Sequence, residues 1–441
     1  MHSDRRKRSM KSNERRKPLA LYVHIPFCVR KCAYCDFLSA PASEKEKENY
    51  VNLLCREIER EADCYPDYRG QTVFFGGGTP TTLRAEQLER ILCKLKECFM
   101  ITEKTQEPEI TLECNPGTVN GSDLKKLREA GFNRLSIGLQ SMRNEELERL
   151  GRIHNREDFL ETFYLAREAG FRNINVDLMS ALPGQSVESY ADSLQEVAAL
   201  HPEHISAYSL IIEEGTLFYE RYAEADAERR KDGADKGHLL PTEEEERQMY
   251  ELTKEILGKN GYHHYEISNY ALPGCECRHN ITYWRRGDYL GLGLGAASLV
   301  DNCRFTKSRD LREYEGQLQE CGGSGGSKEG GEYKERYKNG KKVVPAAEGE
   351  EPFTAEYLHQ NQQQLSLQEQ MEEFMFLGLR LTEGITCRDF EDIFQVPIDN
   401  IYGEILERLK GLGLLARSDG RIFLTERGID VSNVVLAEFL L

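Results

Sequence analysis

Hydrophobic and polar residues show two different periodicities over the first half of this 441-residue chain. Between about residues 19 and 210, short runs rich in β-branched and aromatic residues alternate with longer stretches of helical periodicity. The runs that predict strands are LALYVHI, QTVFFGG, EITLEC, RLSIGLQ, NINVDLM and HISAYSL. Strands that alternate with helices indicate βαβ units and a parallel sheet. We therefore expect an α/β fold in which six units form a partial (β/α)6 barrel, with functional residues at the C-terminal strand ends.

The same patterns divide the chain into domains. A core is expected over 19–212, and the less regular residues 213–310 are expected to complete the barrel. Residues 311–365 include CGGSGGSKEGGEYKERYKNGKK, which is poor in apolar residues and predicts a flexible insertion and linker. Over 366–441, helical patterns and the strand pair in LLARSDGRIFLT predict a winged-helix-like C-terminal domain. Its acidic composition favours packing against the core over DNA binding.

Charge and composition exclude several classes of function. Residues 1–18 hold eight Lys/Arg and two acidic residues, which predicts a disordered basic tail; contact with an acidic membrane surface is the weaker alternative. The net charge of the whole chain is −17 and that of this tail is +6, so the rest of the chain carries a net charge of −23. Such an acidic body argues against nucleic-acid binding. No apolar run is long enough to span a bilayer. Thirteen cysteines without an export signal favour a reducing compartment, and we expect a cytoplasmic protein.

The stretch FCVRKCAYCDF places Cys28, Cys32 and Cys35 within eight residues. Fe–S clusters are held by closely spaced thiolates on a loop, and three thiolates leave one iron of a [4Fe–4S] cluster open to an exogenous ligand. Structural zinc is the alternative, but such a site normally has four protein ligands. His24, which precedes the loop, could complete it.

The longer stretch YVHIPFCVRKCAYCDF resembles the signature of the radical S-adenosyl-L-methionine (SAM) superfamily, in the branch that contains the oxygen-independent coproporphyrinogen III oxidase HemN and the related haem chaperone HemW. The resemblance implies a [4Fe–4S] cluster on the three cysteines, with SAM bound to the fourth iron through its amino and carboxylate groups. It also implies contacts to SAM from Tyr22 and from Tyr34, which lies on the adenine side. It covers nearly the whole chain outside the tail and the glycine-rich insertion.

The stretch FFGGGTPT lies between a predicted strand and a predicted helix. Glycines there let the backbone approach a polar ligand and offer it N–H groups. Taken alone, a glycine triplet is as often a tight turn. The resemblance assigns Gly77, Gly78 and Thr79 to the methionine part of SAM.

Polar side chains follow on the next three predicted strands and on one loop. Glu113 ends the third strand and Asp177 the fifth, and a carboxylate at a strand end can accept hydrogen bonds from ribose hydroxyls. Each residue alone is more often a surface charge, but together they converge on one mouth of the barrel. The family places SAM ligands at the matching positions, which are Glu113, Gln140, Arg152 and Asp177. One departure is Ala181, where the family often has glycine before Leu-Pro.

The stretch CECRHNITYW contains the only tryptophan of the chain. Histidine is a common axial ligand of haem iron and aromatic rings stack on the macrocycle, although such a stretch is more often a packed loop. A metal site that combines the two cysteines with the histidine is a weaker alternative, because the C-x-C-x-H spacing is unusual. The motif is similar to the HNxxYW motif that marks the haem chaperones and is implicated in haem handling, which makes the haem candidates His279, Asn280, Tyr283 and Trp284.

Residue 37 separates the functions within the family. The oxidase carries a fourth cysteine two places after the third, whereas Phe37 stands there in this chain. We therefore expect a haem chaperone that carries the cluster and SAM, takes haem as cargo and lacks oxidase activity. The oxidase itself and a related radical SAM methyltransferase are the alternatives. The resemblance further implies acceptor haem proteins, expected among respiratory proteins near the membrane, and a homodimer.

Overall fold

The computed structural model of the protein describes residues 16–102, 107–233, 237, 239–319, 336–338, 341–343 and 358–441. The predicted basic tail, apart from its last three residues, and most of the glycine-rich insertion lie outside this part of the chain.

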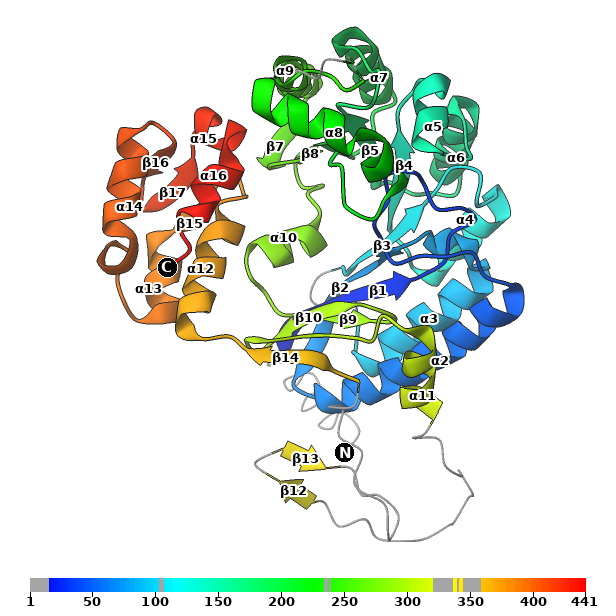
Figure 1. Cartoon of the computed structure of the whole chain (residues 1–441). Coiled ribbons are helices and arrows are strands. Elements are labelled where there is room, and N and C mark those ends of the chain that lie inside the picture. The colour runs from blue at the N-terminus through cyan, green and yellow to red at the C-terminus, as the bar shows by residue number, and fades with distance from the viewer. Residues whose placement is uncertain are drawn as a thin grey trace, which may run out of the picture.

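All six predicted strands form, and they pair in parallel in the order of the sequence (Figure 1). Because each strand neighbours the next one along the chain, all their carboxyl ends meet at one edge of the sheet. This confirms the predicted α/β fold and its six βα units. The strands are β1 (Lys17–Ile25), β2 (Tyr68–Gly77), β3 (Glu109–Cys114), β4 (Arg134–Gln140), β5 (Ile174–Ser180) and β6 (His204–Ser209).

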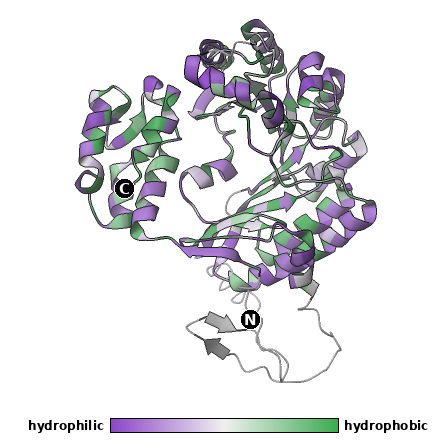
Figure 2. Cartoon of the chain, in the orientation of Figure 1, coloured by the Kyte–Doolittle hydropathy of each residue, from purple (hydrophilic) through white to green (hydrophobic). Residues whose placement is uncertain are grey.

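Amphipathic helices connect these strands and cover the outer face of the sheet. Figure 2 shows their polar residues toward solvent, while the buried apolar residues of strands and helices form one continuous core. The first of them starts at a capping box, in which the side chains of Ser43 and Glu46 satisfy backbone N–H groups. The helices are α2 (Glu44–Cys64), α3 (Ala85–Cys98), α4 (Gly121–Ala130), α5 (Asn144–Leu150), α6 (Arg156–Glu168) and α7 (Val187–Ala199), with a short 3-10 helix, η1 (Pro80–Thr82), before α3.

Further strands extend the sheet on both sides of the parallel core. Beyond β6 lie the antiparallel strands β8 (Asn269–Ala271) and β7 (His263–Glu266). On the other side β9 (Tyr289–Leu292) runs parallel to β1, followed by the strands β10 (Ala297–Val300), β11 (Cys303–Thr306) and β14 (Gln360–Gln364). The edge strands β14 and β7 do not pair with each other in the described chain, so the barrel is open, as expected of a partial barrel. This part also holds the helices α8 (Leu217–Asp232), α9 (Glu243–Lys259), α10 (Arg278–Trp284) and α11 (Leu311–Gln319).

The ends of the expected insertion are ordered parts of the core. Helix α11 lies within the segment expected to be flexible, and its Tyr314 and Leu318 are fully buried. At the other end His359 stacks on Phe305 and contacts the buried carboxylate of Glu61 at 3.0 Å. These anchors are few and are interleaved with charged residues, which is why composition alone extended the flexible segment too far. Within the insertion, β12 (Arg336–Lys338) and β13 (Lys341–Val343) form an antiparallel pair.

The C-terminal domain has its own apolar core and lies beside the barrel (Figure 1). The predicted helices and strand pair are α12 (Leu367–Gly378), α13 (Cys387–Phe394), α14 (Asp399–Gly411), β16 (Leu415–Ser418) and β17 (Arg421–Leu424). The structure adds the short elements β15 (Ile385–Thr386), α15 (Glu426–Asp430) and α16 (Ser432–Ala437). Strand β15 completes a three-stranded sheet of order β15-β17-β16. As predicted, the domain packs against the core, and the buried side chain of Glu373 forms ion pairs with Arg286 and Arg304 of the core.

No helix among the described residues is both long and apolar enough to cross a membrane.

Candidate functional site

The three clustered cysteines lie on the loop that follows β1, at the carboxyl edge of the sheet. The loop is fixed at its base, where the Cys28 N–H donates to the carbonyl of Ala40 at 3.1 Å. Its middle is held against the C-terminal end of α5, because the Ala33 N–H donates to the carbonyl of Leu150, the last residue of that helix, at 3.0 Å. All three cysteines are free thiols and are partly exposed. The sulfur atoms therefore sit on a loop that the barrel holds in place.

The thiols suit a cluster better than a single ion. No three His, Cys, Asp or Glu side chains of the described chain are grouped closely enough to hold one metal ion. In a [4Fe–4S] cluster each thiolate binds a different iron, so the sulfur atoms need not converge on one point. Burial raises the pKa of Cys35 to about 11, the N–H of Phe37 opposes this, and Cys32 and Cys28 add to the rise. Cluster binding has to displace the proton of this thiol.

The zinc alternative finds no fourth ligand in His24. Its Nε2 lies 2.9 Å from the Leu38 carbonyl oxygen, and its Nδ1 lies 3.1 Å from the hydroxyl of Tyr22. Both ring nitrogens are thus engaged, and the ring is buried. His24 instead holds the end of the cysteine loop. The ring of Tyr22 also stacks on Phe74 of β2, which places the tyrosine beside the glycine turn.

The glycine turn packs directly against the start of the cysteine loop. A Cβ at Gly78 would lie 2.6 Å from the Phe27 carbonyl oxygen, and Gly77 has a φ of +106°, which favours glycine. The N–H of Gly78 donates to Ile25 and that of Thr79 to Phe27, at 2.9 and 2.7 Å. These two N–H groups are therefore used by the backbone and are not offered to a ligand, contrary to our expectation. The glycines allow close approach of two chain segments.

The two predicted carboxylates lie inside the barrel on β3 and β5. Burial raises the pKa of Glu113 to about 8; the charge of Asp177 adds to the rise, and the N–H of Gly77 opposes it. Burial likewise raises the pKa of Asp177, and a hydrogen bond that Asn175 Nδ2 donates at 2.7 Å partly opposes this rise. Asp177 lies in the middle of β5 and not at its end as expected. Because strand residues alternate between faces, its side chain still reaches the neighbourhood of Glu113.

Gln140 is the last residue of β4 and adopts a positive φ of 77°. Its side-chain oxygen accepts a 3.0 Å hydrogen bond from the hydroxyl of Tyr208, the residue before the last of β6. Sequence reasoning did not single out Tyr208. The signal was present, since it is a polar aromatic residue near a predicted strand end.

Arg152 and Thr79 each approach one of the cysteine sulfurs. Arg152 Nη1 lies 3.6 Å from Cys32 Sγ, and Thr79 Oγ1 lies 3.5 Å from Cys28 Sγ. Between them is Asn115, whose Nδ2 donates to Thr79 Oγ1 at 2.7 Å and whose Oδ1 accepts from Arg152 Nη2 at 2.8 Å. Sequence reasoning also missed Asn115, although it directly follows the predicted strand EITLEC, just beyond the end of β3.

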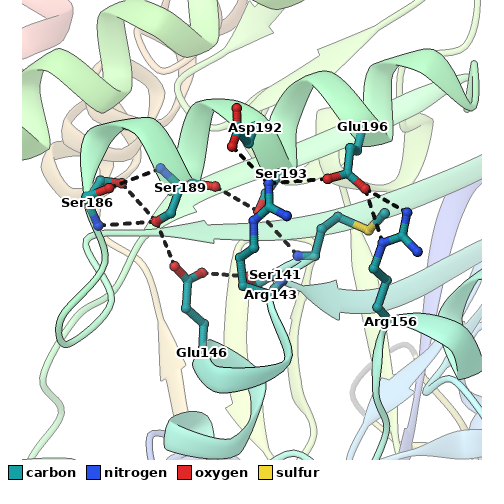
Figure 3. Close-up of polar contacts among 10 residues, drawn as sticks. Ser141, Arg143, Glu146, Arg156, Ser186, Ser189, Asp192, Ser193 and Glu196 are labelled. Carbon is teal, nitrogen blue, oxygen red and sulfur yellow. Dashed lines mark hydrogen bonds and ion pairs between the residues drawn. The ribbon is translucent and has the colours of Figure 1, made fainter.

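A buried polar network fixes the loops that carry these groups (Figure 3). The carboxylate of Glu146, on α5, accepts hydrogen bonds from Ser141 at 2.6 Å, from Ser189 at 2.8 Å and from Gln185 at 2.9 Å. Ser189 belongs to α7, so the network joins the segment after β4 to the segment after β5. Gln140 directly precedes Ser141 of this network in the chain, and Arg152 lies two residues beyond the end of α5.

Tyr34 belongs to a small apolar cluster at the mouth of the barrel, where its ring lies 6.3 Å from that of Phe218. The Phe218 N–H donates to the carbonyl of Ala33 at 2.9 Å, which ties the segment after β6 to the cysteine loop. Three residues further on, Phe37 is 59% exposed. The position that distinguishes oxidase from chaperone therefore lies on the surface.

The predicted haem residues lie on α10, away from the cysteines in the chain. This helix packs against the inner face of β2, which carries Thr72 and Phe74 and points away from α2 and α3 (Figure 1). His279 is 1% exposed; its Nδ1 lies 2.9 Å from Thr72 Oγ1 and its Nε2 2.8 Å from the hydroxyl of Tyr283. Burial lowers the pKa of His279 to about 3, and Arg134 adds to the fall. Both ring nitrogens are thus engaged, so in this structure His279 does not present a free nitrogen to an iron.

The other end of α10 contacts the C-terminal domain. The guanidinium of Arg380 lies 4.4 Å from the centre of the Trp284 ring, a cation–π contact. The buried Nε1 of Trp284 has no hydrogen-bond partner in the described structure. Asn280 is partly exposed. The weaker metal alternative at this motif is not supported, because Cys277 is buried against Glu109 and His279 is engaged as described.

The residues at the mouth of the barrel suit the two groups that the sequence implied. The buried Nε of Arg152 lacks a hydrogen-bond partner in the described chain, which is typical of a site that receives a polar ligand. Cys32, Thr79, Asn115 and Arg152 line one cavity. The charge of Arg152 acts on the pKa of Asp177, against the burial that raises it, and Asp177 in turn acts on Glu113. The two carboxyl groups are therefore near Arg152, and their oxygens can accept hydrogen bonds from ribose hydroxyls.

Comparison with known proteins agrees with this geometry. Residues 22–197 match the radical SAM superfamily and residues 365–431 match the HemN C-terminal domain. The chain is 34% identical to the haem chaperone HemW of Lactococcus lactis over 96% of this chain and 98% of the relative. It is 33% identical to HemW of Bacillus subtilis over 95% and 98%. To HemW of Escherichia coli it is 39% identical, over 67% of this chain and 75% of the relative.

A solved structure shares the whole fold. The coproporphyrinogen III oxidase HemN of Escherichia coli, a radical SAM enzyme, superimposes with a TM-score of 0.73 over 98% of this chain and 92% of that protein. The two sequences are 24% identical, so this likeness concerns the fold alone.

Proposed function

Because the chain belongs to the HemW family of radical SAM proteins, we propose that it binds haem and delivers it to haem-accepting proteins. The observation that carries the proposal is Phe37: an exposed apolar side chain ends the cysteine loop where the oxidase has a fourth cysteine. Together with relatives named haem chaperones that match almost end to end, this supports the chaperone over the oxidase.

The cofactors of the proposed chaperone are a [4Fe–4S] cluster and SAM. Cys28, Cys32 and Cys35 would hold three irons, and SAM would occupy the fourth. When bound, the cluster supplies electrons to SAM. The residues that would contact SAM are Tyr22, Tyr34, Gly77, Gly78, Thr79, Glu113, Gln140, Arg152 and Asp177. For the glycines this means contact through close approach, because two N–H groups of the turn are engaged in the backbone.

The α10 residues remain our candidates for haem, with one condition that follows from their contacts. His279 would have to give up its hydrogen bonds to Thr72 and Tyr283 before either ring nitrogen could bind iron. Release of α10 from β2 would provide this. Asn280, Tyr283 and Trp284 would then become available together, since all lie on the same short helix.

The oxidase is the second candidate function. It is favoured by the shared fold and by the complete set of SAM candidates at the mouth of the barrel. Decarboxylation of coproporphyrinogen III would require the same cluster and the same SAM site, so neither cofactor distinguishes the two functions.

We further propose a cytoplasmic location, acceptor haem proteins of the respiratory chain as partners, and a homodimer in solution. The test of the function is a titration of the anaerobically reconstituted full chain with haem, followed by mixing with an apo-haem protein. Saturable haem binding and appearance of the acceptor's holo spectrum are expected. A protein that neither binds haem nor transfers it would overturn the proposal.

A further inference from the structure

Two of the cysteine sulfurs are joined by a continuous chain of side-chain hydrogen bonds. It runs from Cys28 to Thr79, from Thr79 to Asn115, from Asn115 to Arg152, and from Arg152 to Cys32, with lengths of 3.5, 2.7, 2.8 and 3.6 Å. The amide of Asn115 is the middle link. It touches neither sulfur itself, but it touches both groups that do.

Hydrogen-bond chemistry fixes the direction of every link. A guanidinium can only donate, so the oxygen of the Asn115 amide must face Arg152 and its nitrogen must face Thr79. Thr79 Oγ1 therefore accepts from Asn115, and its single hydrogen is left for Cys28 Sγ. A sulfur that binds iron is a thiolate and accepts this hydrogen. Asn115 thus directs one donor at Cys28 and one at Cys32.

Both donors are held rigidly by other contacts. Thr79 is 3% exposed, and its N–H is bonded to the Phe27 carbonyl at 2.7 Å. Arg152 also donates to the carbonyl of Gly138, on the central strand β4. Because a Cβ at Gly138 would lie 3.1 Å both from Arg152 Nη2 and from Asn115 Oδ1, the absence of a side chain there leaves room for this link.

We infer that Asn115 is a positioning residue that raises the reduction potential of the cluster by aiming Thr79 and Arg152 at two of its thiolates. Hydrogen bonds to cluster sulfurs stabilise the reduced state, which carries the additional negative charge. The inference rests on the proposed function in one respect, namely that the three cysteines carry a [4Fe–4S] cluster.

The test is a redox titration of the reconstituted full chain without SAM, followed by the EPR signal of the reduced cluster. In Asn115→Leu both donors lose their orientation. At the midpoint potential of the wild type, the ratio of reduced to oxidised cluster is expected to fall roughly fivefold, the factor that corresponds to one ordinary hydrogen bond. That fold-change equals a midpoint about 40 mV more negative. Asn400→Leu, an exposed substitution on α14, is the matched control and is expected to leave the potential unchanged.

Two variants of Thr79 keep the inference testable if the Asn115 variant fails to fold. Thr79→Val removes the donor to Cys28 and is expected to lower the potential, whereas Thr79→Ser keeps the hydroxyl and is expected to match the wild type. A wild-type potential in Asn115→Leu, or in Thr79→Val, overturns the inference. If the wild type itself assembles no cluster, the proposed function fails instead, so the two failures are distinguishable.

Discussion

Glu113 on β3 and Asp177 on β5 lie close enough for the charge of Asp177 to add to the burial that raises the pKa of Glu113 to about 8. On β4, the strand between them, the residue in register with Asp177 is Gly138. Because glycine has no side chain, Gly138 does not separate the two carboxyl groups. Two carboxyl groups in a buried site are costly unless a ligand or proton balances their charge. This pair is therefore suited to a ligand with hydroxyl donors and a positive charge, as SAM has.

The raised pKa of Glu113 predicts an unusual dependence of stability on pH. Its ordinary value is 4.5, so between pH 4.5 and about 8 the folded protein binds more protons at this site than the unfolded chain does. This contribution to the free energy of unfolding is therefore lost as the pH rises through that window. Glu113→Gln is expected to flatten the loss, measured by chemical denaturation at about pH 5.5 and about pH 8.5. Glu97→Gln, at an exposed glutamate, is the control. Equal pH dependence in the wild type and Glu113→Gln would contradict the prediction.

Gly78→Ala tests the close approach of the glycine turn to the cysteine loop. The added Cβ would lie 2.6 Å from a backbone oxygen, so one of the two segments must move. We expect a loss of about 1–3 kcal/mol in the free energy of unfolding, as for overpacked cores, together with weaker SAM binding by calorimetry. Gly258→Ala, in α9 with open space around it, should instead stabilise the protein by about 0.5–1 kcal/mol. Wild-type SAM affinity in Gly78→Ala would argue against a tight turn at the cofactor.

His279 and Thr72 predict opposite effects on haem binding. If His279 binds iron after α10 is released, His279→Ala is expected to weaken haem binding and change the Soret band. Thr72→Val leaves the buried Nδ1 unpaired at a cost of about 1–3 kcal/mol to the packed helix, which favours release and should strengthen haem binding. Spectroscopic haem titrations measure both. Wild-type affinity in His279→Ala would remove the axial-ligand proposal, and wild-type affinity in Thr72→Val would remove the release condition.

The cysteine loop predicts which thiols hold iron. Alanine at Cys28, Cys32 or Cys35 should abolish most of the bound iron and the broad visible absorption of the reconstituted protein. Cys64→Ala and Cys93→Ala, at exposed thiols on α2 and α3, should retain both. Iron analysis of the five variants is the measurement. Full iron content in any of the three loop variants would exclude that cysteine as a ligand.

The fold could be predicted from the sequence because its strands are short, apolar and regularly spaced. All six core strands lie where the alternation of runs and helices put them. The helix α11 was missed because its buried residues, Tyr314 and Leu318, are surrounded by charged and polar ones next to a glycine-rich stretch. Composition averaged over that segment conceals two well-packed side chains.

The sequence predicted which types of residue form the candidate site, but not which of them contact one another. The spacing of the cysteines and the polar residues near strand ends could be seen in the sequence. That Asn115 links Thr79 to Arg152 depends on the distance between three separate loops, which no local pattern encodes. For His279, the sequence motif suggested a residue that is open to a ligand, but the structure buries it. Thr72 and Tyr283 contact its ring nitrogens, and Glu109 accepts from its backbone N–H.

One measurement tests the central claim most directly. A single anaerobically reconstituted sample, with its cluster content known, is divided between two assays. One half receives haem and an apo-haem acceptor; the other receives coproporphyrinogen III, SAM and a reductant. The account predicts transfer of haem in the first half and no decarboxylated porphyrin product in the second. Turnover of coproporphyrinogen III without haem transfer would contradict it and identify the protein as an oxidase.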